Sequence, residues 1–251
     1  MTSTLLDSAN LRGPRLLGQS VVVLGGSAGI GLETARHARG EGADVVLVGR
    51  DPDRLRQASA EVDAVRTAAF DATDTAHVQR FFAELPAPVD HVMVTAGGNY
   101  YARLADLDFI QARRLVDDHL WLALHLARAA AGKIRPAGTL LFMGGTGGRR
   151  PGLGLVLSGT LTAALPTLVA NLALELAPVR VNLIAAGFVD TPLSARLLGD
   201  DLEQRRDQLR ATLPIGRVVG PADIAALAIH LMTNTALTGA TYDIDGGQQF
   251  L

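Results

Sequence analysis

The chain contains no cysteine among its 251 residues. This absence excludes disulfide bonds and thiolate metal sites, and it suits a reducing cytoplasm. The six histidines are scattered without metal-ligand spacing, so we expect no metal site. No apolar run reaches the ~18 residues of a membrane span, and residues 1–17 lack the apolar core and cleavage site of a signal peptide. We therefore expect a cytoplasmic protein that makes no use of a membrane.

The chain also has little net charge, and it contains few lysines and tyrosines. The formal net charge is −2 and no block of basic residues stands out, which argues against nucleic acid as a partner. Lys133 is the only lysine, and the tyrosines are Tyr100, Tyr101 and Tyr242. The whole stretch between Tyr101 and Tyr242 therefore lacks a tyrosine.

A glycine-rich stretch organises the chain. Residues 21–31 are Val-Val-Val-Leu-Gly-Gly-Ser-Ala-Gly-Ile-Gly, and a helical pattern follows. A strand, a glycine turn and a helix in this order bind phosphate, because exposed N–H groups and the helix dipole favour an anion. The alternative is a glycine-rich turn that binds nothing, since the spacing differs from G-x-G-x-x-G. We interpret six residues as cofactor-binding: Gly25, Ser27, Ala28, Gly29, Ile30 and Gly31.

Each of three glycines has a predicted purpose in this loop. Gly25 permits a sharp turn, Gly29 keeps side chains away from a pyrophosphate, and Gly31 permits close packing of the helix on the strand.

Apolar strand patterns and helical patterns alternate along the chain. We expect strands at 21–24, 44–50, 65–71, 89–94, 139–143, 179–185 and 241–244. After the helix that follows the glycine loop, we expect helices at 52–61, 76–85, 108–134, 156–176 and 221–232, and a polar helical lid at 194–213. Pro166 falls inside one helix and predicts a kink or an irregular turn there.

This alternation predicts an α/β fold of the Rossmann-like, doubly wound type. We expect three α/β/α layers around a seven-stranded parallel sheet. One domain should cover residues 19–251, after an N-terminal extension over residues 1–18. Ligands of such sheets bind beyond the carboxyl ends of the strands. The segments expected at that edge are 25–31, Arg50, Asp71, 95–101, 144–148 and 186–191.

The end of the second strand bears on the choice between NADP and NAD. An acidic residue there would bind the adenine ribose and repel a 2′-phosphate, but this strand ends at Arg50. A guanidinium is a forked donor suited to phosphate, so we expect NADP(H) in preference to NAD(H). The alternative is a surface arginine that pairs with Asp51 or Asp53. Asp71, followed by Ala72, ends the third strand and either reaches the adenine or caps the following turn.

Further motifs accompany the glycine loop at characteristic places. They are Asp71, Ala96-Gly97, Val181-Asn182, 187–192, 221–225 and Asp245-Gly246-Gly247. With these motifs the chain resembles the short-chain dehydrogenase/reductase family over about residues 19–247. The resemblance implies that Thr191 hydrogen-bonds the nicotinamide amide and that Ile30, Ala96 and Gly97 line the cofactor. Minor departures from the family pattern occur at Leu24, Val94-Thr95 and Ala186.

The residues that the resemblance implies for proton transfer are all replaced. The family uses a tyrosine, a lysine four residues later, a serine on the preceding loop and an asparagine on the long helix. Ser158 stands at the tyrosine position and Thr162 at the lysine position. Gly145, with Thr146 beside it, stands at the serine position, and His119 at the asparagine position.

Five residues on the expected edge could act instead. His119 can exchange a proton near neutral pH, or it is a histidine satisfied by a backbone carbonyl. Tyr100 and Tyr101 can donate a proton, or they pack as aromatic walls. Thr146 and Ser158 can hydrogen-bond a substrate oxygen, although a serine cannot replace the tyrosine as an acid.

Three functions are compatible with this pattern. The first is an atypical NADP(H)-dependent oxidoreductase that transfers hydride to a small carbonyl, quinone or enone without the tyrosine–lysine pair. The second is a catalytically inactive NADP(H)-binding or partner protein on the same fold. The third is a non-redox elimination or isomerisation in the same pocket, with His119 as the base. Lys133 cannot assist any of them, because it precedes the fifth strand at the opposite edge of the sheet.

The helices at 108–134 and 156–176 carry more apolar side chains than one core face needs, among them Trp121 and Leu174. The resemblance implies a homodimer or homotetramer through these helices. The alternative is burial inside the monomer.

Overall fold

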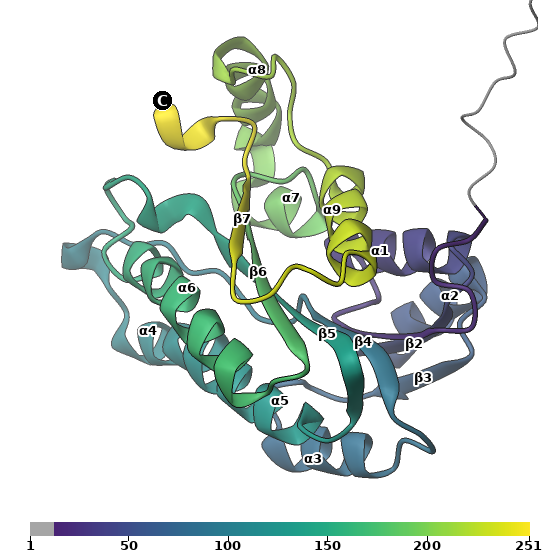
Figure 1. The fold of residues 1–251 in the computed structure, drawn as a ribbon. Coiled ribbons are helices and arrows are strands. Elements are labelled where there is room, and N and C mark those ends of the chain that lie inside the picture. The colour runs from purple at the N-terminus through teal and green to yellow at the C-terminus, as the bar shows by residue number, and fades with distance from the viewer. Residues whose placement is uncertain (1–12) are drawn as a thin grey trace, which may run out of the picture.

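The architecture was established from a computed structural model, which describes residues 13–251. Seven parallel strands form one sheet in the order β3-β2-β1-β4-β5-β6-β7, with helices on both faces (Figure 1). The predicted Rossmann-like α/β/α fold is therefore confirmed. The strands are β1 (Ser20–Leu24), β2 (Asp44–Gly49), β3 (Arg66–Ala69), β4 (Val89–Val94), β5 (Ile134–Gly145), β6 (Arg180–Ala186) and β7 (Thr241–Ile244).

The helices divide between the two faces of the sheet. One face is packed by α1 (Gly29–Gly40), α2 (Pro52–Val62) and α9 (Pro221–Thr233). The other is packed by α3 (Thr75–Ala83), α5 (Leu122–Ala130) and α6 (Ser158–Glu175). The remaining helices are α4 (Phe109–Val116), α7 (Pro192–Leu198) and α8 (Leu202–Thr212).

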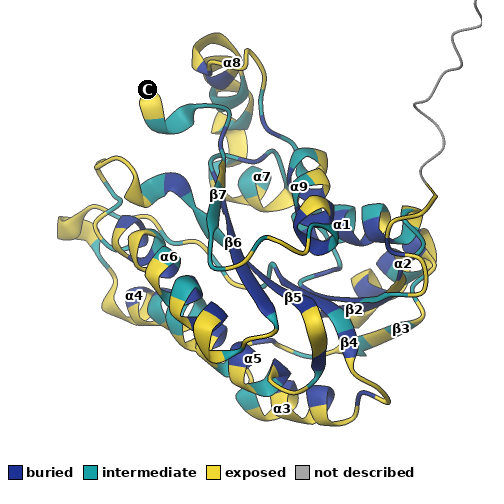
Figure 2. Ribbon diagram, viewed as in Figure 1, coloured by how far each residue is buried: buried dark blue, intermediate teal, exposed yellow. Residues whose placement is uncertain are grey.

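Burial on both faces explains why the strands appear as unbroken apolar runs. Along β1, Val22 and Leu24 enter one core, whereas Val21 and Val23 enter the other. Because successive side chains of a strand point to opposite faces, a strand covered on both sides is largely apolar. Figure 2 shows the central strands as buried between exposed helix surfaces.

Local signals placed several helix starts correctly. Pro52 occupies the first turn of α2, and the Asp74 carboxylate caps α3 by accepting hydrogen bonds from the N–H groups of Ala76 and His77. Asp108 caps α4 in the same way, through the N–H groups of Ile110 and Gln111. Such caps satisfy N–H groups that have no partner inside the helix.

The long helix predicted over 108–134 is interrupted. A π-helical turn, η3 (Asp117–Trp121), separates α4 from α5. A π turn is rare and changes the direction of the side chains that follow it. It falls on His119, one of the predicted site residues, and therefore shapes the candidate site directly.

Other element boundaries also differ from the prediction. β5 begins at Ile134 rather than at residue 139, with a register shift opposite Val89 and His91 of β4. α6 continues through Pro166 without a break, so the expected irregular turn is absent from the described helix. The predicted lid consists of α7 and α8, joined by a short turn at Gly199–Asp201.

Part of the expected N-terminal extension packs on the sheet domain. Leu16 is fully buried, and its N–H donates to the carbonyl of Glu41 at 2.9 Å. The Arg15 guanidinium also contacts the Glu41 carboxylate at 2.6 Å. Residues 1–12 of the extension lie outside the described residues.

Within residues 13–251, every helix is too short or too polar to cross a lipid bilayer.

A buried histidine at the amino end of β4 makes the stability of the fold depend on pH. His91 is 3% exposed, its Nε2 lies 2.7 Å from Oε1 of Gln19, and its Nδ1 finds no partner in the described part of the chain. Burial lowers the pKa of His91 from 6.5 to about 4. The folded protein therefore holds this ring neutral at pH values where the unfolded chain binds a proton.

We predict that the free energy of unfolding falls as the solution is acidified from pH 7.5 to pH 5. The contribution of His91 is complete above its unfolded pKa and is lost below it, by about 2 kcal/mol over this range. Urea unfolding at the two pH values measures the change, with His91→Gln as the comparison. An equal loss in the variant would assign the effect to other groups.

Candidate functional site

Gly25 and Gly31 have the geometry that the sequence predicts for them. Gly25 has φ +92°, and a Cβ there would lie 2.5 Å from Oγ1 of Thr95. A Cβ on Gly31 would lie 2.2 Å from the carbonyl oxygen of Gly25, so only glycine fits. Gly29 has φ +55°, which adds a conformational reason for glycine to the predicted one.

Thr95, which directly follows β4, holds the start of this loop in place. Its hydroxyl lies 3.0 Å from the carbonyl oxygen of Leu24 and 3.2 Å from that of Gly25, and donates toward both. In the sequence, Thr95 is only a minor departure from the pattern of the family that the chain resembles. Only the packing of β4 beside β1 reveals that it holds the glycine turn.

The amino end of α1 is open to an anion. Its N-cap residue, Ala28, offers no side-chain hydrogen bond, and the first turn contains no acidic residue. The backbone N–H groups at this end are therefore free to bind a pyrophosphate. Ser27 lies beside the end of β2, where its Oγ would be 3.1 Å from a Cβ on Gly49. The glycine loop and the end of β2 thus form one continuous surface.

Arg50 does not form either of the surface ion pairs considered as an alternative. Asp51 caps α2 through the N–H groups of Asp53 and Arg54, and the Asp53 carboxylate pairs with Arg56. The Arg50 side chain is 78% exposed and lies 3.9 Å from the carboxylate of Asp71. At this distance and exposure the guanidinium keeps most of its donors for a ligand.

Asp71 acts as a turn cap, which was the alternative to adenine binding. Its carboxylate accepts hydrogen bonds from the N–H (3.0 Å) and the hydroxyl (2.9 Å) of Thr73. The Ala72 side chain is buried in the core, so only its backbone can face a cofactor. Ala96 is half-buried against the same core, and Gly97 has φ +128° beside the backbone of Asp118.

The π turn brings Asp118 and His119 to this edge. The Asp118 carboxylate accepts a hydrogen bond from the N–H of Gly98 at 3.0 Å, which ties the turn to the loop after β4. Burial raises the pKa of Asp118. Asp118 is a residue that the sequence analysis missed, because a rare π turn inside a helical pattern has no clear local signal.

One ring nitrogen of His119 is satisfied by a backbone carbonyl, as the second interpretation of this residue predicts, and the other is not. Nδ1 lies 3.0 Å from the carbonyl oxygen of Leu115 and therefore carries the proton. Nε2 is then an acceptor, and it makes no hydrogen bond within residues 13–251. Burial lowers the pKa of His119, so the neutral form is favoured at pH 7.

Two hydroxyl groups lie on elements that contact one another. Thr146 begins the turn η4 (Thr146–Gly148), and Ser158 begins α6, which packs on both η4 and η3. Both residues are buried, and Oγ of Ser158 has no hydrogen-bond partner in the described structure. Buried polar groups without partners are uncommon, and this hydroxyl oxygen is itself shielded from solvent.

The two predicted tyrosines have different surroundings. The Tyr100 hydroxyl accepts a hydrogen bond from the N–H of Asp108 at 2.8 Å, which places it at the start of α4. Tyr101 is half-exposed, and its local environment raises the pKa of the phenol through desolvation. A raised pKa keeps Tyr101 protonated and makes it a weaker acid than free tyrosine.

Thr191 lies against the glycine loop, 3.6 Å from the position of a Cβ on Gly29. Its hydroxyl oxygen also caps α7, accepting from the N–H of Ser194 at 3.2 Å and lying 3.0 Å from the Ser194 hydroxyl. Since a hydroxyl oxygen has two lone pairs, this cap leaves one of them for the predicted nicotinamide contact.

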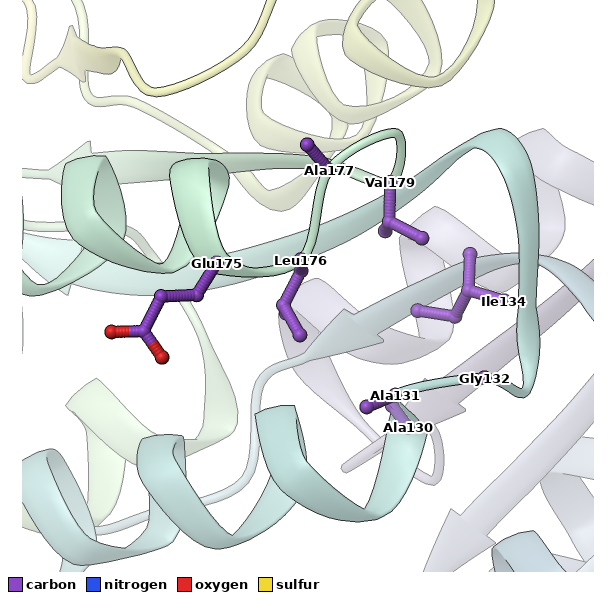
Figure 3. A pocket seen from close by; sticks show the side chains of 8 residues that line it. All are labelled: Ala130, Ala131, Gly132, Ile134, Glu175, Leu176, Ala177 and Val179. Atoms are coloured by element: carbon purple, nitrogen blue, oxygen red, sulfur yellow. The ribbon is translucent and has the colours of Figure 1, made fainter.

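A separate pocket of about 220 Å³ lies at the opposite end of the sheet, between the ends of α5 and α6 (Figure 3). Its lining is apolar apart from Glu175, and it includes none of the predicted site residues. Lys133 lies in the same region, where Nζ donates to the carbonyl of Ala83 at 3.3 Å. This position agrees with the exclusion of Lys133 from the cofactor edge.

No cluster of histidine, aspartate and glutamate suited to a metal ion occurs among residues 13–251.

Comparisons with known proteins agree with this geometry. A family model described as enoyl-(acyl carrier protein) reductase matches residues 25–249. The chain is 32% identical to galactitol 2-dehydrogenase (L-tagatose-forming) of Cereibacter sphaeroides, covering 93% of this chain and 96% of that protein. It is 29% identical to an NADP-dependent (R)-specific alcohol dehydrogenase of Lentilactobacillus kefiri, covering 93% and 97%.

A solved structure of a small-chain dehydrogenase in complex with NADPH superimposes with a TM-score of 0.80 at 27% identity, covering 93% of this chain and 99% of that one. The fold, the glycine loop and these matches lead to one conclusion: the chain belongs to the short-chain dehydrogenase/reductase family, whose members are oxidoreductases that bind a nicotinamide cofactor.

Proposed function

We propose that the protein is an atypical NADP(H)-dependent oxidoreductase that transfers hydride to a small carbonyl, quinone or enone. The observation that carries the proposal is the continuous cofactor surface from the glycine loop to Arg50. The amino end of α1 is uncapped by side chains, and Arg50 is exposed where a 2′-phosphate would lie. Two relatives whose names include NADP or NADPH support this cofactor.

The substrate side of the proposed site is built from neutral groups. Ser158 and Thr146 offer hydroxyls, and His119 offers an unprotonated Nε2. None of these groups supplies the strong acid that a simple ketone needs during hydride transfer. Quinones and activated enones spread the developing negative charge over several atoms, so they suit such a site best. The cofactor supplies the hydride, and the chain's residues orient the acceptor.

The cofactor part of the proposal is tested by direct binding. We predict that Arg50→Ala weakens NADPH binding about 10- to 100-fold, the worth of charge-assisted hydrogen bonds, and leaves NADH binding nearly unchanged. Nicotinamide fluorescence titration measures both affinities, and Arg54→Ala is the matched control because its guanidinium faces Asp51. Equal weakening of NADPH and NADH would contradict a role for Arg50 at the 2′-phosphate.

The proton-transfer part is tested at His119. We predict that, at pH values low enough to protonate His119, His119→Ala lowers kcat for carbonyl reduction by at least tenfold, while the Kd for NADPH changes by less than about twofold. Protonated His119 would be the donor, so the rate should rise as the pH falls through a value below 6.5, the direction in which burial moves the pKa. Stopped-flow absorbance of NADPH across the pH range measures this dependence in both proteins.

The remaining hypotheses appear as distinct outcomes of the same assays. Tight NADPH binding without oxidation of NADPH by any quinone, enone or ketone would favour the non-catalytic binding protein. Conversion of a substrate without a change in nicotinamide absorbance would favour the elimination or isomerisation.

We also propose that the chain forms a homodimer or homotetramer through α4, α5 and α6. Part of the apolar surface of these helices is used inside the monomer, since Leu126 and Val169 are fully buried. Trp121 is 54% exposed and Leu174 is 80% exposed, together with Phe109 on α4. Exposed apolar patches of this kind are typical of protein interfaces.

We predict that light scattering after gel filtration gives the mass of a dimer or tetramer, and that Trp121→Glu shifts it toward the monomer. Phe250→Glu is a control that places the same charge at an exposed aromatic residue outside these helices. A wild-type monomer at micromolar concentration would contradict the proposal.

A further inference from the structure

We propose that residues 243–251, here named the C-terminal turn, clamp together the three segments that border the substrate side of the site, and that Gln248 is the positioning residue of this clamp. The three segments are residues 187–188, which lead into the lid, residues 214–215, which follow it, and the glycine-rich loop at 144–154. The assignment of these segments to the substrate side rests on the proposed function; the clamp itself rests on their contacts.

The first contact holds the start of the lid. The N–H of Phe188 donates to Oε1 of Gln248 at 2.8 Å, and the N–H of Gly187 lies 3.3 Å from the carbonyl of Ile244. A Cβ on Gly187 would lie 2.6 Å from Cβ of Asp245 and 2.8 Å from Oε1 of Gln248. The backbone at Gly187 thus lies as close to Asp245 as a glycine permits, and the Gln248 side chain adds a hydrogen bond between the two segments.

The second contact holds the end of the lid against the same turn. A Cβ on Gly247 would lie 2.5 Å from Cγ of Pro214, and one on Gly246 would lie 2.8 Å from Cδ1 of Ile215. Both glycines have positive φ, so the turn has a backbone conformation that other residues rarely adopt. The lid therefore leaves and rejoins the domain at one place.

The third contact reaches the loop that carries Thr146. Arg149 donates two hydrogen bonds to the Asp243 carboxylate, from Nη2 at 2.8 Å and from Nε at 3.1 Å. A two-point guanidinium–carboxylate pair fixes orientation as well as distance. Figure 1 shows the C-terminal segment at the same end of the molecule as α7 and α8.

The C-terminal turn is itself held by a buried carboxylate. Asp245 is 4% exposed and accepts hydrogen bonds from the N–H groups of Gly247 at 2.8 Å and Gln249 at 3.0 Å. These bonds fix the backbone on both sides of Gln248 independently of the contact between its side chain and Phe188. Because its backbone is fixed, the carboxamide oxygen of Gln248 is held in position to accept a hydrogen bond.

The consequence for the site follows from the short distance along the chain between Phe188 and Thr191. Thr191 packs against Gly29 of the glycine loop and caps α7. Loss of the Gln248 acceptor leaves the Phe188 N–H without its partner and loosens the segment that leads to Thr191. Gln248 thus acts through this loop, without contact to the cofactor loop in the described structure.

The test compares hydrogen exchange in full-length variants. Gln248→Met keeps the size of the side chain but removes the acceptor, whereas Gln248→Glu retains an acceptor. We expect amides of residues 187–215 to exchange about tenfold faster in the methionine variant, as for the loss of one buried hydrogen bond. Exchange in the glutamate variant should return to within about threefold of wild type.

Gln249→Ala is the matched control, because it removes only a contact from Nε2 to Asp243 at 3.3 Å and keeps the backbone bond to Asp245. Peptides from residues 44–62, which cover β2 and α2, should be unchanged in all variants, which shows that the domain is folded. Unchanged exchange over 187–215 in Gln248→Met, or an equal increase in Gln249→Ala, would overturn the proposal.

A second measurement separates the clamp from the proposed function. If the protein turns over, Gln248→Met should raise KM for the hydride acceptor about tenfold and change the NADPH Kd by less than about threefold, with recovery in Gln248→Glu. If no hydride transfer occurs in wild type, the proposed function fails, but the exchange experiment still decides whether the clamp exists.

Discussion

The close approach of Gly31 to Gly25 is the constraint on which the rest of the structure depends. A Cβ on Gly31 would lie 2.2 Å from the Gly25 carbonyl oxygen, so α1 rests directly on the end of β1. Thr95 secures the same turn from the neighbouring strand β4. This packing directs the uncapped amino end of α1 toward the carboxyl edge of the sheet, where an anionic cofactor can bind.

The other site segments meet at that edge because all seven strands are parallel. Their carboxyl ends carry Arg50, the loop that contains Thr146, and the segment that leads to Thr191. Under the proposed function, this edge divides into a cofactor side and a substrate side. Arg50 places positive charge on the cofactor side, whereas the substrate side carries hydroxyls and a neutral imidazole.

Two long-range contacts govern how the site is positioned. The Asp118 carboxylate ties the π turn to Gly98, so His119 and the loop after β4 share one fixed arrangement. The Gln248 carboxamide ties the C-terminal turn to Phe188, which leads to Thr191 and the lid. In both cases a side chain accepts a hydrogen bond from a loop N–H that has no ladder partner. Such contacts hold connecting loops in one conformation beside the candidate site.

The sequence by itself determined the layers, the parallel sheet and the glycine loop, because these follow from apolar periodicity and from steric limits within a few residues. The caps at Asp74 and Asp108 are local in the same sense. Only the tertiary structure decided that the long helix contains a π turn, that α6 continues through Pro166 and that Asp71 caps a turn. It also decided the partners of His119, Tyr100 and Gln248, since each hydrogen bond depends on which backbone group the folded chain brings within reach.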